Sequence, residues 1–129
     1  MNKILVEVSV GELLDKISIL EIKQEKIKDQ NNLKFIKDEY NVLKAELNKN
    51  IKNDDKLKSL FNSLKEINSK LWVIEDDKRM CEKNKDFGEN FIKLSRDVHF
   101  LNDNRAKIKL EINNHTDSKI KEIKEYTKY

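Results

Sequence analysis

Apolar residues recur at intervals of three and four along most of the chain, which is the spacing of an amphipathic helix. The pattern predicts four helices, over residues of about 10–28, 32–48, 54–83 and 87–114. The last two are the longest, and only a short turn near residue 85 separates them. We therefore expect an all-α protein, an up-down helical bundle around a long antiparallel helical hairpin, in a single domain of residues 1–129.

The two ends of the chain depart from the helical pattern. Residues 4–8 are rich in β-branched side chains and predict a short N-terminal strand. A capping box beginning at Ser9 starts the first helix, and a second one beginning at Asp86 starts the last helix. Residues 115–129 predict either a frayed helix or an extended tail paired with the N-terminal strand, and we adopt the pairing as our prediction.

The composition agrees with a fold of few, long helices. It also argues against nucleic acid and membranes as partners. Charged residues make up 40% of the chain, with two Gly and no Pro, although β-rich folds need many turn residues. The 27 basic and 24 acidic residues are interleaved, which argues against a nucleic-acid-binding protein. Cys81 is the single cysteine, and no apolar run approaches the roughly 18 residues of a membrane span. We therefore expect a cytoplasmic protein without membrane contact.

Charged residues occupy positions on the apolar faces of three helices, with Glu75 and Glu82 on that of the third. Glu21 falls within the apolar stripe of the first helix, and Arg105 falls within that of the last. If the helices run up and down, the residues of the last helix at the same height as Glu21 lie within about one turn of Arg105. An ionised group in a core is costly unless it is paired. We therefore expect a buried polar or ligand-binding cluster of Glu21, Asn102, Arg105 and Lys109.

The long hairpin extends past the reach of the two shorter helices, so residues 72–98 should project as a two-helix arm. The arm carries six aromatic or charged residues of interest, namely Trp72, Glu75, Arg79, Glu82, Phe87 and Phe91. A second copy on a two-fold axis would cover the rings and let Arg79 meet an opposing carboxylate. We therefore expect a homodimer joined through the arm. Two alternatives are an ordinary surface pair of Glu75 with Arg79, and a steep helix crossing that covers the rings within one chain.

Three other motifs indicate structure rather than chemistry. Glu12 and Asp15 form an E-x-x-D pair without the companion motif of helical phosphohydrolases, so we assign them to a solvated face. His99 and His115 lie far apart in sequence without a cysteine beside them, which disfavours a metal site. Cys81 has no histidine within sequence reach and is expected to be a small apolar filler. We expect no cofactor and no metal.

The chain resembles a family of short bacterial and phage-borne helical proteins that is classed as a domain of unknown function. The resemblance is carried by the opening Gly11-Glu12-Leu13-Leu14-Asp15-Lys16-Ile17-Ser18-Ile19-Leu20-Glu21-Ile22-Lys23, by Leu71-Trp72, Ile74-Glu75-Asp76, Arg79, Cys81-Glu82 and Asp86-Phe87-Gly88, and by Phe91, Asn102-Asp103 and Arg105. The chain departs from it at residues 99–101, where a Tyr-Arg-Thr-like stretch is typical. The resemblance implies a shared fold and shared unusual residues, and no activity.

Two classes of function follow from these observations. The first is a non-enzymatic binding or assembly module whose arm docks a second copy or another protein. The second is a small helical enzyme or ligand binder that holds an anionic small molecule through Arg79, Arg105 and Lys109, with Glu21 or Glu75 as acid or base. The first is the prediction we adopt, because the sequence has no nucleophile motif and no phosphate-binding loop.

Overall fold

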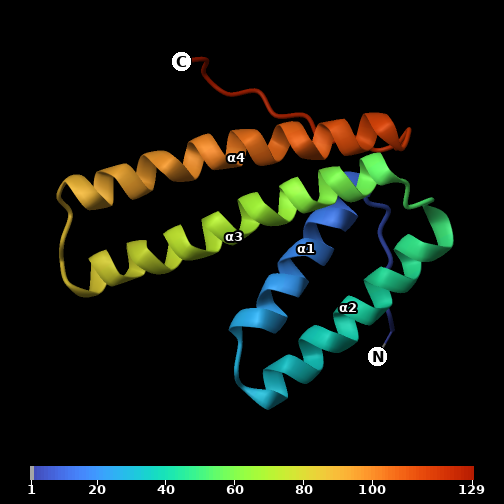
Figure 1. Ribbon diagram of the computed structural model, residues 1–129, viewed down its shortest axis with the longest axis horizontal. Helices are drawn as coiled ribbons and strands as arrows, with labels where there is room; N and C mark the ends of the chain where they lie inside the picture. Colours follow the sequence, from blue (N-terminus) through green and yellow to red (C-terminus); the bar gives the residue numbers. More distant parts are fainter. Residues whose placement is uncertain (1) are drawn as a thin grey trace.

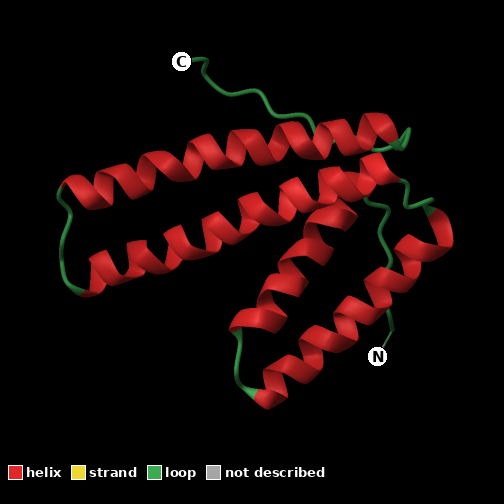
Figure 2. Ribbon diagram, viewed as in Figure 1, coloured by secondary structure: helices red, strands yellow, loops and turns green. Residues whose placement is uncertain are grey.

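The computed structural model describes residues 2–129 and consists, in that range, of four helices joined by short turns (Figures 1 and 2). Helix α1 spans Val10–Lys26, α2 Gln30–Asn50, α3 Asp55–Lys83 and α4 Glu89–His115. The all-α class and the long antiparallel hairpin, formed by α3 and α4, are confirmed. No helix within residues 2–129 is both long and apolar enough to cross a membrane.

Side chains at three helix starts satisfy backbone N–H groups that have no partner inside the helix. Ser9, Asp29 and Asp54 each accept a hydrogen bond from the N–H three residues further on, at 2.8–3.0 Å. The second predicted capping box is wrong. Gly88 is the N-cap of α4 and offers no side chain, because Asp86 instead accepts from the N–H of Gly88 (3.2 Å) and closes the turn. Helix α4 therefore begins at residue 89 rather than 87.

The predicted N-terminal strand and its pairing with the C-terminal tail are wrong. No strand is present among residues 2–129, and Ile4 in the extended segment before α1 is 90% exposed. The tail instead runs back along α4, where the hydroxyl of Tyr129 donates to the carboxylate of Asp103. The two chain ends consequently lie on opposite sides of the α3–α4 hairpin (Figure 1). Side-chain bonds to α4 hold the tail away from the segment that it was predicted to pair with.

The α1–α2 hairpin crosses the α3–α4 hairpin obliquely, near the end where α3 begins and α4 finishes (Figure 1). The backbone of α1 comes close to all three other helices, whereas within the described residues the backbone of α2 comes close to that of α1 alone. The buried core lies at this crossing and consists of Leu14, Ile17, Leu47, Leu57, Leu64 and Ile112. The oblique crossing leaves the aromatic tip of the arm uncovered, and Phe87 there is half exposed.

Helix α1 approaches the backbone of α4 closely at Gly11. The N–H of Gly11 donates to Oδ1 of Asn113 at 2.7 Å. A Cβ at this position would lie 2.6 Å from the carbonyl oxygen of Lys109, so any larger residue would push the two helices apart. Glycine therefore sets the distance at which the next turn of α1, with Asp15, meets α4.

Candidate functional site

A buried carboxylate joins α1, α3 and α4. Asp15 is only 1% exposed. Its Oδ1 accepts hydrogen bonds from Nε of Arg105 (3.0 Å) and from Nδ2 of Asn68 (2.8 Å), while Nη2 of Arg105 binds Oδ2. The same amide of Asn68 donates to Oγ of Ser18 (2.8 Å). We call these four residues, Asp15, Ser18, Asn68 and Arg105, the Asp15 network. Its bidentate ion pair fixes the guanidinium in orientation as well as in position.

The charges of the Asp15 network and its neighbour Lys109 are balanced within the protein. The hydrogen bonds to Asp15 raise the pKa of Arg105 against the opposing effect of burial. Nζ of Lys109 binds Glu12 at 2.8 Å and Glu122 of the tail at 2.9 Å. Burial alone would lower the pKa of Lys109, but these two carboxylates outweigh burial and the pKa rises. Both cations are therefore charged at neutral pH.

The predicted pairing of Glu21 with Arg105 is wrong. Glu21 instead binds Nζ of Lys65 at 3.2 Å and accepts from the hydroxyl of Tyr40 at 3.3 Å. Burial and the neighbouring Glu21 together raise the pKa of Tyr40. The prediction assumed nearly parallel helices, but α1 crosses α3 obliquely and has moved away from α4 by the turn that carries Glu21.

Asp15 is the residue that the sequence reasoning missed. The prediction that Glu12 and Asp15 face solvent is wrong, because both carboxylates meet cations of α4. A signal for this was present in the sequence. Gly11, Asp15 and Ser18 follow one another at spacings of four and three, so one face of α1 is built from small and short polar residues. Such a face marks a close helix–helix contact rather than a solvated surface.

A cleft of about 430 Å³ separates α1 from the near part of the arm. It brings together four of the residues predicted from sequence, Trp72, Glu75 and Arg79 of α3 and Arg105 of α4. Nη1 of Arg79 donates both to the carboxylate and to the backbone carbonyl of Glu75, at 2.8 Å each. The remaining lining residues are Ile19, Ile22, Asn68, Leu71 and Asp76. Lys109 and Glu21 of the predicted cluster lie outside this cleft.

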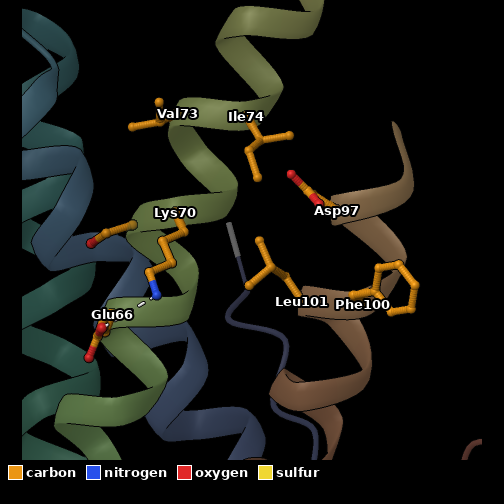
Figure 3. A pocket seen from close by; sticks show the side chains of 8 residues that line it. Glu66, Lys70, Val73, Ile74, Asp97, Phe100 and Leu101 are labelled. Atoms are coloured by element: carbon orange, nitrogen blue, oxygen red, sulfur yellow. Dashed lines mark ion pairs between the residues drawn. The ribbon is translucent and has the colours of Figure 1, made fainter. Parts of the chain in front are cut away.

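An apolar groove of about 620 Å³ runs along the opposite side of α3, between α3 and α4. The residues of α3 that line the groove and those that line the cleft fall about half a turn apart at ~100° per residue. Figure 3 shows Ile74 and Leu101 directed into the space between the two helices, beside an ion pair of Glu66 with Lys70 (3.5 Å). The groove is lined by Glu66, Ser69, Lys70, Val73, Ile74, Asp97, Phe100 and Leu101.

The other predicted residues lie at the tip of the arm or along α4. Phe87 and Phe91 stack edge to face with 5.4 Å between ring centres, and Glu82 is exposed nearby. Cys81 is buried between the two arm helices, as expected for a small apolar filler. Asn102 is partly buried and, within residues 2–129, its side chain makes no hydrogen bond, so it does not join the Asp15 network.

The chain belongs to a family of unknown function. The family model described as "Family of unknown function (DUF6165)" matches residues 4–129. No match is found among curated proteins or among solved structures. The predicted membership of a domain-of-unknown-function family is thereby confirmed, and no activity comes with it. The cleft, the groove and the charges around them are the features of the structure that bear on function.

Proposed function

We propose that this protein is a cytoplasmic binding and assembly module that forms a homodimer through the groove side of its arm. The observation that carries the proposal is the groove between α3 and α4, whose lining includes the partly exposed side chains of Val73 and Phe100. A contiguous apolar surface of this kind on a charged protein is typical of an interaction site. The lone Cys81 agrees with a reducing compartment.

Further exposed apolar side chains lie along the arm beyond the groove. Met80, Phe87 and Ile92 are each about half exposed. Full burial of one such side chain contributes roughly 1.5–3 kcal/mol, so these three half-exposed side chains together forgo about one and a half times that amount. A second copy of the chain would cover these side chains, because an interface on a two-fold axis buries the same residues on both chains.

The charges around the groove support a second copy as its occupant. Glu66 and Lys70 flank the groove on α3, and Lys93 and Asp97 form a 2.6 Å pair on α4. Both signs are therefore present on each helix. When two identical surfaces meet across a two-fold axis, an acidic residue on one copy can lie opposite a basic residue on the other. A single-sign surface would instead repel its own copy.

The face proposed here differs from the one suggested by sequence. That suggestion had Arg79 of one chain meeting Glu75 or Glu82 of the other. In the structure Arg79 already binds Glu75 within its own helix, on the cleft side of the arm. The groove side supports dimer formation better, because its apolar residues have no cover and its charges are of both signs.

The alternative of acid–base chemistry has less support. Glu21 lies outside the cleft and is bound by Lys65. Glu75 does line the cleft, but its carboxylate is already bound by Arg79 of the same helix at 2.8 Å. Lys109 is bound by two carboxylates and is not free to hold a substrate.

Sedimentation equilibrium at micromolar concentration tests the proposal. We expect a species of twice the 15.4 kDa chain mass. Val73→Lys should shift it to monomer, because the groove would gain a desolvated charge from each copy. The matched control is Val42→Lys, since Val42 is equally apolar and 63% exposed but lies on α2, away from the arm. A single 15.4 kDa species in the unaltered protein, or equal effects of the two substitutions, would overturn the proposal.

A further inference from the structure

We infer that the cleft between α1 and the arm binds a small organic anion, one with a single carboxylate or phosphate group on an apolar or aromatic body. The cleft lies on the opposite side of α3 from the groove, so this site goes beyond the proposed dimer and is independent of it. Its lining combines two guanidinium groups with an apolar floor, the usual make-up of a site for an amphipathic ligand.

The first anion-binding group is Arg105. Two of its nitrogens, Nε and Nη2, are bound to Asp15, which is almost completely buried. Its third nitrogen, Nη1, has no hydrogen-bond partner within residues 2–129, and the side chain remains 27% exposed at the cleft. The guanidinium is therefore held in place before any ligand arrives. A donor that is fixed in advance loses little side-chain entropy on binding.

The second anion-binding group is Arg79. Its Nη1 is bound to Glu75, while Nε and Nη2 have no partner in the part of the chain that the structure describes. Arg79 is mostly exposed at the rim of the cleft, and Arg105 is more deeply placed. Guanidinium groups donate paired N–H bonds that match the oxygens of a carboxylate or phosphate. The two arginines together offer such donors from α3 and α4.

The floor of the cleft determines what kind of anion fits. Ile19 and Ile22 of α1 and Leu71 and Trp72 of α3 line it. An indole ring presents a flat apolar face on which an aromatic or aliphatic body can stack. A bare inorganic ion would leave this floor wet and gain only the contacts to the arginines.

The acidic residues of the cleft restrict the ligand to low negative charge. Glu75 and Asp76 also line it, and Asp15 lies behind Arg105. The two positive charges of Arg79 and Arg105 are thus accompanied by three carboxylates. A polyanion gains no net attraction from such a site, because the acidic residues outnumber the basic ones. Recognition therefore depends on directed hydrogen bonds and on apolar contact together.

Tryptophan fluorescence reports on this cleft directly, because Trp72 is the only tryptophan of the chain. We would titrate the full chain with benzoate and phenyl phosphate, with benzyl alcohol as the neutral analogue, and with acetate and inorganic phosphate as anions without an aromatic body. Benzoate or phenyl phosphate should give a saturable change with a Kd of about 1 mM or lower, at least tenfold tighter than the three controls. Whichever of benzoate and phenyl phosphate binds with the lower Kd shows whether the cleft prefers a carboxylate or a phosphate.

A matched pair of arginine variants separates cleft binding from charge in general. Arg79→Gln should weaken binding about tenfold, because it removes a charged hydrogen-bond donor from the rim. Arg96→Gln on α4 removes an equal charge outside the cleft and should leave binding unchanged. Both arginines are largely surface residues, so circular dichroism should report intact folding in each variant.

Two outcomes would overturn the inference. One is the absence of any saturable fluorescence change with both aromatic anions, and the other is equal affinity in the Arg79→Gln and Arg96→Gln proteins. Neither outcome bears on the dimer, whose mass is measured separately by sedimentation. Val73→Lys, which should abolish the dimer, should leave the affinity for benzoate unaltered.

Discussion

The two ends of the α3–α4 hairpin use charged residues in different ways. At the base, where α1 packs on the hairpin, Asp15 and Lys109 are buried and are bound by partners from other helices. On the arm, pairs such as Glu75–Arg79 form within one helix and stay largely exposed. Loss of a partner in a buried pair strands a charge in the core, whereas an exposed pair contributes little. The base depends on its charges for stability, and the arm does not.

Apolar residues show the reverse distribution. Ile17, Leu64 and Ile112 at the base are completely buried, whereas Val73 and Ile92 on the arm are about half exposed. A buried side chain is already satisfied within the chain, but a half-exposed one gains free energy when another molecule covers it. The base therefore serves folding, and the arm carries the surface at which we propose interaction. Four substitutions test this division.

The largest effect is expected from Asp15→Asn at the base. Removal of this charge leaves Arg105 without its anion and should lower the free energy of unfolding by about 3 kcal/mol, the lower end for a buried pair since the guanidinium keeps some water access. The urea midpoint measures the loss. Asp97→Asn on the arm, which removes only an exposed pair with Lys93, is the control. Equal midpoints for the two variants would abolish the contrast between base and arm.

A smaller loss is expected from Gly11→Ala. The new Cβ would lie 2.6 Å from the backbone of α4, so the helices must move apart at a cost of roughly 1–3 kcal/mol. Gly88→Ala at the start of α4 is the matched control, because its nearest contact is 3.4 Å away and only the loss of a glycine N-cap, roughly 0.5–1 kcal/mol, is expected there. Thermal unfolding of both proteins compares them. The idea of a close contact at the base fails if Gly11→Ala melts no lower than Gly88→Ala.

The tail should leave α4 in acid, with a modest effect on stability. The hydrogen bond from Lys109 lowers the pKa of Glu122. A lowered folded-state pKa means that the contribution is complete above the ordinary value of 4.5 and is lost as pH falls through the lowered value. The exposed carboxylate contributes about 0.5 kcal/mol. NMR shifts of residues 118–120, which are not sequence neighbours of either substitution, should change at neutral pH in Glu122→Gln and not in Glu125→Gln. Equal shift changes at residues 118–120 in the two variants would contradict the tether.

The smallest effect is expected from Glu75→Ala on the arm. This removes one exposed ion pair within α3, which is worth about 0.2–0.5 kcal/mol. Its urea midpoint should be close to that of the unaltered protein. A loss of unfolding free energy comparable to that of Asp15→Asn would show that the charges of the arm also stabilise the fold. The division between base and arm would then be wrong.

The path of the tail and the partner of Arg105 show where sequence reasoning stopped. Glu21 and Asp15 were both visible as carboxylates of the first helix, six residues apart. Which one meets α4 depends on the angle at which α1 crosses the hairpin, and a one-dimensional pattern contains no crossing angle. The tail was predicted to pair with residues 4–8, but the bonds of Glu122 and Tyr129 to α4 decided its position.

The four helices, the long hairpin and the capping of the first helix at Ser9 could be predicted from the sequence, because helical period and caps are set by residues within a few positions of one another. The apolar pattern also identified Arg105 as a charge on an otherwise apolar helix face. The three-dimensional packing of the helices was needed to show that Asp15 neutralises Arg105 and that Trp72, Arg79 and Arg105 share one cleft. The same packing places an apolar groove on the other side of α3. These features join residues far apart in the chain, so they depend on how helices cross, which local patterns do not specify.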